Sequence, residues 1–171
     1  NQVSCNGRIV LPPQRQATVA LTIGGVIKNT SLLPGQHVTK NSVIATLENP
    51  EFITLQQTYL DSHAQTEYLR MEYERQKNLS AEQAASQKKF QQSKADYLSM
   101  KSRQDAAAAQ LSLLGVNPET LLRDGIQPLL EVKAPISGYV VNVAMNMGKY
   151  INPGEALCEV IDKSAPMLCL T

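Results

Sequence analysis

The sequence predicts an α+β fold in which a small β-sandwich is split by a long antiparallel α-helical hairpin. Residues 50–114 contain no glycine and a single proline at their first position, whereas short apolar segments lie on both sides of them. The segments before and after this stretch also repeat one pattern of glycines and apolar residues. Such a repeat predicts two similar halves that pack on each other.

Strand-like segments surround the helical stretch. Residues 8–11 and 17–23 are apolar and rich in β-branched residues, and two prolines separate them. Residues 42–47 complete the part before the helices. After the helices, a polar connector at residues 115–128 leads to a new strand pattern at residues 129–132. We therefore expect strands on both sides of an inserted helical unit.

The internal repeat has an offset of 113 residues, as from Gly25 to Gly138. The matching pairs at this offset are Gly25 and Gly138, Asn29 and Asn142, Gly35 and Gly148, Val38 and Ile151, Ile44 and Leu157, and Leu47 and Val160. Neither half alone buries both faces of its strands. We expect the two halves to form one sandwich, with both helix roots at one end of it.

Residues 50–114 are rich in strong helix formers, and two apolar stripes indicate two helices. One stripe is Phe52, Leu55, Tyr59, Leu69 and Tyr73, with Ser62 and Thr66 in register; the other is Phe90, Tyr97, Met100, Ala107, Leu111 and Leu114, with Ser93 and Gln104. Steps of three and four residues are typical of a narrow seam against one partner helix. The pattern breaks at residues 79–86, so we expect the tip at residues 82–85. Ser86 is predicted as the N-cap of the second helix and Gly115 as its C-cap.

Composition and motifs exclude several functions. The formal net charge is +1 and no Lys/Arg cluster occurs, so nothing indicates a nucleic-acid surface. No apolar run approaches the roughly 20 residues of a membrane-spanning helix. The sequence has no Ser-His-Asp set in a plausible order, no phosphate-binding glycine loop and no carboxylate pair in an apolar context. We therefore expect neither an enzyme nor a cofactor.

The glycine turns and apolar segments that recur in the two halves resemble the biotinyl/lipoyl-carrier fold. Carriers of that fold hold a modified lysine where the halves join, whereas residues 47–51 here read Leu-Glu-Asn-Pro-Glu, which argues against a carrier. A lipoyl-like sandwich split by an α-hairpin instead resembles the periplasmic adaptor proteins, or membrane fusion proteins, of tripartite efflux pumps. The sequence segments on which this resemblance depends are residues 25–27, 34–38, 134–138 and 148–154. Residues 49–51, 57–60 and 113–116 look most like the heavy-metal-efflux branch, whose transporter is of the resistance–nodulation–division class.

The resemblance implies an organisation and a function. It places the lipoyl-like halves at residues 23–49 and 129–162, and assigns residues 1–22 and 163–171 to strands of a truncated β-barrel domain. The implied function is a periplasmic adaptor that links an inner-membrane transporter to an outer-membrane channel, assembles as a ring, commonly a hexamer, and is anchored by an N-terminal segment outside this chain. The exported substrate is a metal ion or a small toxic compound. The alternatives are an adaptor for an ABC-type exporter and a periplasmic metal-binding module that feeds a pump.

The resemblance also supplies candidate site residues at the tip of the hairpin. Family members that dock onto a channel carry an Arg, a Leu four residues later and a Ser seven after that. Arg75, Leu79 and Ser86 have this spacing. Arg75 would donate to carbonyls or carboxylates of the channel, Leu79 would supply an apolar contact, and Ser86 would hydrogen-bond across the junction. In the alternative interpretation Arg75 is solvated, Leu79 packs within the tip and Ser86 only caps its helix.

Metal ligands are sparse in the sequence. His37 and His63 have no second histidine at a helical spacing, so we expect no metal site. Met145 and Met147 carry thioethers that suit Cu(I), and an extended backbone would point both to one side. Methionine more commonly fills gaps in a core.

The three cysteines differ in their surroundings. Cys158 lies in an apolar strand pattern, so we expect a buried thiol that serves as a small apolar side chain. Cys5 and Cys169 lie in the first and last strand-like segments. Whether they form a disulfide stays open, since spacing alone does not show pairing.

Overall fold

The chain folds into two units. The computed structural model describes residues 15–80 and 84–162, so the strand expected at residues 8–11 and the residues Cys5 and Cys169 lie outside the described part. Residues 50–128 form one unit, and the described residues before and after them form the other.

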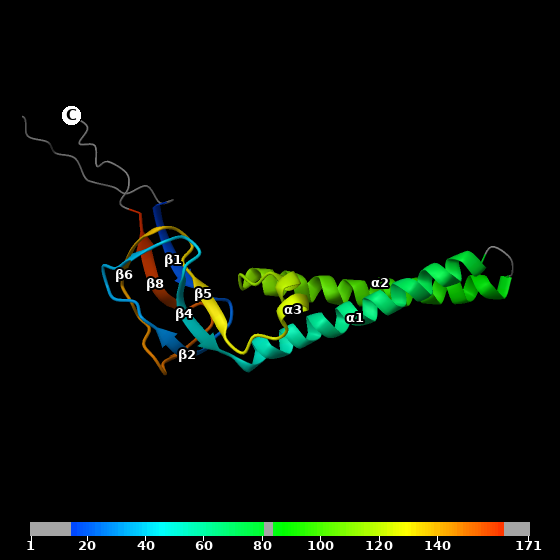
Figure 1. Ribbon diagram of the computed structural model, residues 1–171, viewed down its shortest axis with the longest axis horizontal. Helices are drawn as coiled ribbons and strands as arrows, with labels where there is room; N and C mark the ends of the chain where they lie inside the picture. The colour runs from blue at the N-terminus through cyan, green and yellow to red at the C-terminus, as the bar shows by residue number, and fades with distance from the viewer. Residues whose placement is uncertain (1–14, 81–83, 163–171) are drawn as a thin grey trace, which may run out of the picture. The chain divides into compact units, whose positions relative to one another are not determined.

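The first unit is a sandwich of two four-stranded antiparallel sheets (Figure 1). One sheet has the order β1-β8-β6-β3 and the other the order β5-β4-β2-β7. The strands are β1 Gln16–Ala20, β2 Gly25–Thr30, β3 His37–Val38, β4 Val43–Glu48, β5 Leu130–Lys133, β6 Gly138–Val141, β7 Tyr150–Ile151 and β8 Ala156–Ile161. Both halves of the chain contribute strands to each sheet, as the predicted fold class requires.

The predicted repeat is confirmed strand by strand, since β2, β3 and β4 match β6, β7 and β8. The halves exchange their shortest strands: β3 pairs with β6 of the other half, and β7 pairs with β2. The backbone N–H of Ile27 donates to Lys149 O at 2.9 Å, and that of Val140 donates to Gln36 O at the same distance. These two bonds join residues at equivalent positions of the repeat. Each half therefore donates the same hydrogen bond to the other, as in a pseudo-twofold arrangement.

Strand β1 corrects the expected domain boundary. It pairs with β8, with Val19 opposite Cys158, just as β5 pairs with β4, with Val132 opposite Ala45. The repeat thus extends to the strand before β2, and β1 is the counterpart of β5. The assignment of this segment to a barrel domain is wrong, because its inward residue Val19 is buried in the sandwich.

The core between the sheets is filled by small and medium apolar side chains. Its fully buried members include Ile27, Leu47, Leu130, Val132, Val140, Ile151, Leu157, Cys158 and Val160. Cys158 is a free thiol, and burial raises its pKa to about 11. The prediction of a buried thiol in the apolar core is confirmed.

The second unit is the predicted helical hairpin. Helix α1 spans Pro50–Leu79 and helix α2 spans Ala84–Leu113, and the two run antiparallel side by side (Figure 1). Gly115 ends α2 with a φ of 79°, and the N–H of Val116 donates to Leu111 O at 3.0 Å. The predicted C-cap is therefore confirmed. No described helix is both long and apolar enough to cross a membrane.

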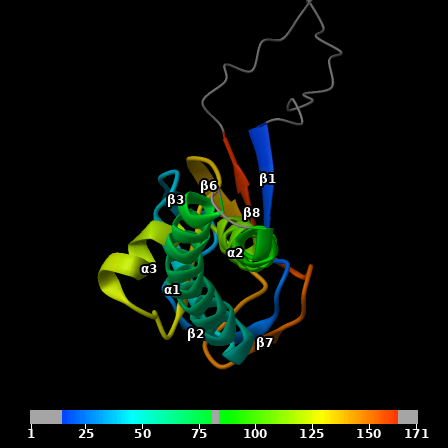
Figure 2. The same ribbon diagram turned by 90° about the vertical axis from the view of Figure 1, so that its right-hand side faces the viewer.

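The connector contains a helix that the sequence analysis did not predict. Helix α3 spans Pro118–Asp124, begins at an Asn117 cap whose side chain accepts from the N–H of Glu119, and buries Leu121. The end-on view in Figure 2 shows α3 beside α1, and α3 contacts α2 as well. The connector is polar overall, so its sequence did not indicate a helix that buries a single leucine on one side.

Gln56 holds the connector to α1. The side chain is fully buried, and its amide Nε2 donates to Gln127 O at 2.9 Å while Oε1 accepts from Gln127 N at 2.8 Å. The same Nε2 also donates to Phe52 O at 3.1 Å. A buried amide whose donor and acceptor are both used replaces the strand partner that the connector backbone lacks.

Gly138→Ala should destabilise the sandwich by about 3 kcal/mol, because an added Cβ would overlap the backbone of Ile161, which side-chain movement cannot relieve. Gly35→Ala is the matched control. Gly35 has a φ of 84° but open space around it, so we expect a loss of only about 1 kcal/mol. Urea denaturation would measure both, and equal losses would contradict the close-approach argument.

Gln56→Leu should lower the free energy of unfolding by about 2 kcal/mol, because the N–H and C=O of Gln127 lose their partners. The neighbouring exposed Gln57→Leu should change it by less than about 0.5 kcal/mol. Hydrogen exchange at Gln127 should accelerate only in the first variant. Unchanged exchange there would show that Gln56 does not hold the connector.

Candidate functional site

The half of the hairpin toward its tip is held by an aromatic stack across the helices. Tyr73 of α1 stacks on Phe90 with ring centroids 5.5 Å apart and on Tyr97 at 5.6 Å, with interplanar angles of 19° and 7°. All three are seam positions predicted from the sequence. A stack of this kind contributes more than its buried area alone, and it fixes the helices near the candidate docking residues.

Elsewhere the seam is filled by short polar side chains. Ser62, Thr66 and Ser93 are buried, and each hydroxyl donates to a carbonyl of its own helix. Across the seam, Gln104 Nε2 lies 3.0 Å from His63 Nδ1. Because these groups are satisfied within the hairpin, the two helices approach closely without large apolar side chains.

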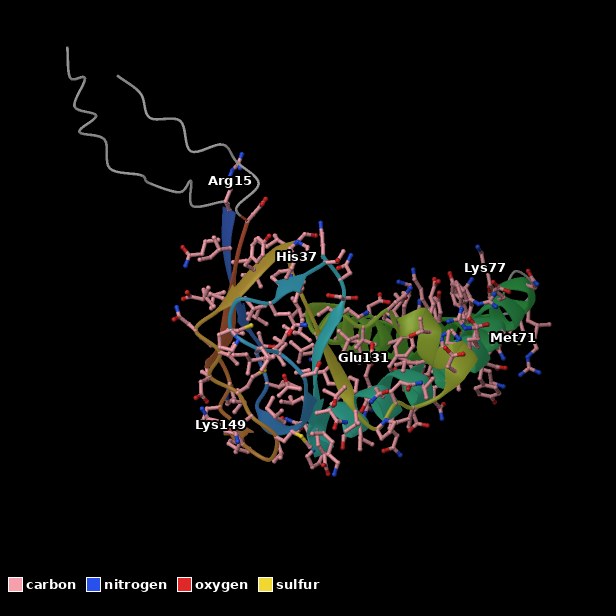
Figure 3. All side chains as sticks on the ribbon, turned by 60° about the vertical axis from the view of Figure 1, so that its left-hand side comes forward. Arg15, His37, Met71, Lys77, Glu131 and Lys149 are labelled. Carbon is pink, nitrogen blue, oxygen red and sulfur yellow. The ribbon has the colours of Figure 1, made fainter. Side chains whose placement is uncertain are left out.

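Arg75 and Leu79 are both exposed near the end of α1. Arg75 forms an ion pair with Glu72, which raises the pKa of the guanidinium and helps lower the pKa of the Glu72 carboxyl. Leu79 is 52% exposed, so it does not pack within the tip. The two residues are one helical turn apart and lie on one face of α1, available to a partner. Figure 3 shows Met71 and Lys77 in the same region.

Ser86 does not cap α2. The helix begins at Ala84, so Ser86 lies within its first turn, and the predicted capping role is wrong. Alanine is the strongest helix former, and Ala84 and Ala85 extend the helix before Ser86. Ser86 is half-buried and precedes Phe90 by four residues, which places it on the seam side of α2. The structure thus places Arg75 and Leu79 on one face and Ser86 on a different helix.

The sequence analysis missed two residues on the face of Arg75 and Leu79. Tyr68 and Met71 are 67% and 62% exposed, although both are large and apolar. Their spacing to Arg75 and Leu79 follows steps of three and four residues. The periodicity of three and four residues that identified the inner seam is therefore also the signal that marks this second row on the exposed face of α1.

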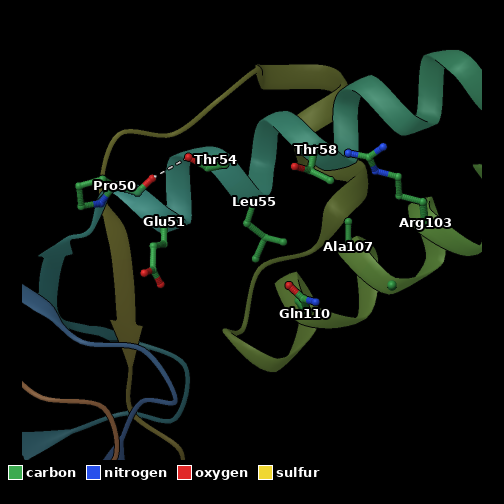
Figure 4. Close-up of a pocket in the computed structure, with 9 residues that line it drawn as sticks. Pro50, Glu51, Thr54, Leu55, Thr58, Arg103, Ala107 and Gln110 are labelled. Atoms are coloured by element: carbon green, nitrogen blue, oxygen red, sulfur yellow. Dashed lines mark hydrogen bonds between the residues drawn. The ribbon is translucent and has the colours of Figure 1, made fainter.

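An open groove runs between α1 and α2 away from the tip (Figure 4). Its volume is about 480 Å³. The lining residues are Pro50, Glu51, Thr54, Leu55, Thr58, Arg103, Ala106, Ala107 and Gln110. Its apolar lining includes Leu55 and two alanines, and Glu51 and Arg103 contribute charges of both signs. Nothing in this lining resembles a catalytic arrangement.

The two histidines considered as metal ligands belong to different units of the chain. His37 stacks edge-on against Tyr139 in the sandwich, with ring centroids 5.2 Å apart, whereas His63 lies in the hairpin. Met145 is buried and Met147 is 63% exposed, so the two do not share one side as an extended strand would require. The described residues contain no group of three or more His, Cys, Asp or Glu arranged to hold a metal ion.

A duplicated sandwich interrupted by an α-hairpin is the architecture of a barrel-sandwich hybrid. The family model described as "CzcB-like, barrel-sandwich hybrid domain" matches residues 15–162, and the chain belongs to this family. The predicted resemblance to membrane fusion proteins is thereby confirmed at the level of the family.

Solved structures share this fold. ZneB from Cupriavidus metallidurans is 26% identical with a TM-score of 0.61, over 89% of this chain and 62% of ZneB. A candidate efflux transporter from Bacteroides eggerthii DSM 20697 is 25% identical with a TM-score of 0.61, over 87% of this chain and 40% of that one. A MacA–MexA chimera carrying the Pseudomonas aeruginosa MexA α-hairpin domain shares the fold at 21% identity and a TM-score of 0.61, over 86% of this chain and 48% of the chimera.

This chain therefore spans less than two thirds of the length of each of these three proteins. No curated protein sequence matches it.

Tyr73→Ala should destabilise the hairpin by about 2 kcal/mol, because two ring contacts are lost in the half toward the tip. Tyr68→Ala is the matched control, since Tyr68 lies on the same helix but is largely exposed, and should change stability by less than about 0.5 kcal/mol. Hydrogen exchange of α1 and α2 near the stack would report the difference. Equal exchange in both variants would show that the stack does not stabilise the hairpin.

Proposed function

We propose that this chain is the central part of a periplasmic adaptor that links an inner-membrane efflux transporter to an outer-membrane channel. The observation that carries the proposal is membership of the CzcB-like family, in which the inserted element of this chain is a narrow two-helix arm. The CzcB-like family and the likeness to ZneB support a transporter of the resistance–nodulation–division class and a metal ion as the exported substrate.

The proposed mechanism is structural coupling rather than bond chemistry. Each 30-residue helix extends about 45 Å at 1.5 Å per residue, so the arm presents its tip far from its roots. Docking of the tip on the channel, with further domains of the adaptor holding the transporter, joins the two membranes. Copies assembled as a ring, commonly six, would enclose the path of the substrate. The adaptor would lie in the periplasm, anchored by an N-terminal segment.

Arg75 and Leu79 are the proposed contacts with the channel. A guanidinium presents a planar fork of donors to carbonyls or carboxylates. Its ion pair with Glu72 is solvent-exposed and therefore easily exchanged for a partner. Leu79 adds an apolar contact one turn closer to the tip. Ser86, at the other side of the junction, would add a hydrogen bond from α2.

Crosslinking in cells tests the proposal. A cysteine at Gln83 in the intact protein, with Cys5 and Cys169 replaced by serine, should form crosslinks to the co-expressed outer-membrane channel. Arg75→Asp and Leu79→Ser should each reduce the yield at least tenfold, because they remove the charged and the apolar contact. Export would be measured in the same cells.

Lys77→Asp is the matched control, since it makes the same charge change two residues from Arg75. It should leave crosslinking within about twofold of the parent. If Arg75→Asp and Leu79→Ser leave crosslinking and export unchanged while the protein stays folded, Arg75 and Leu79 are ordinary exposed residues and the docking proposal is wrong.

A further inference from the structure

The guanidinium of Arg75 is held by a carboxylate of its own helix. Arg75 Nη2 donates a hydrogen bond to Glu72 Oε2. Helix α1 runs from Pro50 toward the tip and ends at Leu79, so Glu72 lies one turn further from the tip than Arg75. Side chains of a helix already lean toward its N-terminus. The ion pair therefore keeps the guanidinium on the side of Arg75 that faces away from the tip.

Glu72 is itself fixed by a second hydrogen bond. Gln76 Nε2 donates to Glu72 Oε1 at 3.0 Å, so each carboxylate oxygen has its own donor. The hydrogen bond from Arg75, followed by that from Gln76, lowers the pKa of the Glu72 carboxyl, which is thus ionised at neutral pH. The Glu72 side chain is 27% exposed, against 67% for Arg75. A well-held anion therefore lies beside an exposed cation.

The hydrogen bond from Gln76 decides what happens when Arg75 turns toward a partner. The Glu72 carboxylate would keep this bond and its access to water, so it would stay in place as the guanidinium leaves. Breaking the ion pair then costs little, as is usual for exposed pairs. A partner nevertheless engages Arg75 only by offering an acceptor that replaces Glu72.

We propose that Glu72 is a positioning residue of the docking site, which retains the Arg75 guanidinium until a channel surface replaces its carboxylate. The inference rests on the proposed docking function and adds a determinant of specificity to it. A competing acceptor within the chain reduces the affinity for every partner that engages Arg75 by one factor. A surface whose acceptor is weaker than Glu72 therefore gains nothing from Arg75.

A second carboxylate on α1 provides a matched control. Glu74 is exposed and pairs with Arg70 at 3.3 Å, and Arg70 also pairs with Glu67 at 3.0 Å. Glu74→Gln makes the same charge change as Glu72→Gln two residues away, but it leaves Arg75 with its partner. A general effect of charge near the tip would appear in both variants, whereas release of Arg75 would appear in only one.

NMR of the guanidinium groups measures the hold on Arg75 in the intact protein labelled with ¹⁵N-arginine. The Arg75 signal is assigned by its loss in Arg75→Lys. Rotation about the Cζ–Nε bond is slower in an ion-paired guanidinium than in a free one. We expect Glu72→Gln to accelerate this rotation in Arg75 and Glu74→Gln to leave it unchanged. Equal rotation in the parent and in Glu72→Gln would overturn the inference.

The channel crosslink from Gln83→Cys measures docking in cells that co-express the outer-membrane channel. Glu72→Gln should raise the initial rate of crosslinking about two- to fivefold, the size expected when a weak exposed pair is removed. Glu74→Gln should leave the rate within about 1.5-fold of the parent. In a protein with Arg75→Gln, adding Glu72→Gln should have no effect, because Glu72 acts through the guanidinium.

The possible results separate this inference from the docking proposal. If the parent crosslinks and Glu72→Gln leaves the rate unchanged or lowers it, the role of Glu72 is wrong and docking stands. If Glu72→Gln still accelerates crosslinking in the Arg75→Gln protein, Glu72 does not act through Arg75, which also overturns the inference. If no variant crosslinks to the channel, the docking proposal fails and the role of Glu72 fails with it.

Discussion

Each half of the sandwich depends on the close approach of two of its own strands at one of a pair of equivalent glycines. Gly25 and Gly138 are buried, and a Cβ at either would meet the carbonyl of the strand beside it, at Glu48 and Ile161. Next to these glycines, the halves exchange backbone hydrogen bonds through Ile27 and Val140. Because each half completes a sheet of the other, neither is a stable unit alone. The repeat is therefore a structural requirement as well as a sequence pattern.

This exchange explains how a long insertion is tolerated. The strands on each side of residues 50–128 are held by partners from the opposite half, with β4 between β5 and β2. Closing a long loop costs little more entropy than closing a medium one, and the inserted helices are ordered by their own seam. The hairpin can therefore vary in length or surface without changing the sandwich, which suits an element that recognises a partner.

The features that could be predicted from the sequence are those marked by apolar residues or glycines at a regular spacing. The repeat, both long helices, the seam residues and the buried Cys158 follow from spacing and apolar pattern. Strand β1 was misassigned because only Val19 and Val132 are identical between it and β5, so its pairing with β8 depends on tertiary structure. Helix α3 was missed although Asn117 and Pro118 form a recognisable start, because its single buried leucine gives no period.

The candidate site was harder to predict than the fold for a physical reason. Gln56 was not singled out from the sequence, because nothing in a helical pattern shows that an amide will meet the backbone of Gln127, 71 residues away. Ser86 was read as a cap because serine favours that position, but the alanines before it favour helix more strongly. Local preferences compete at a helix end, and one sequence does not show which prevails.

The narrow seam has a consequence for the outside of the hairpin. A two-helix unit buries only one stripe of each helix, and here that stripe is partly filled by serine, threonine and glutamine. Tyr68, Met71, Leu79 and Leu98 stay exposed, which is unfavourable for an isolated chain in water. A solitary hairpin would be more soluble with polar residues at these positions. Their presence is explained if the hairpin works with its outer faces covered, the end of α1 by a partner at the tip and the remaining exposed positions by other parts of the proposed assembly.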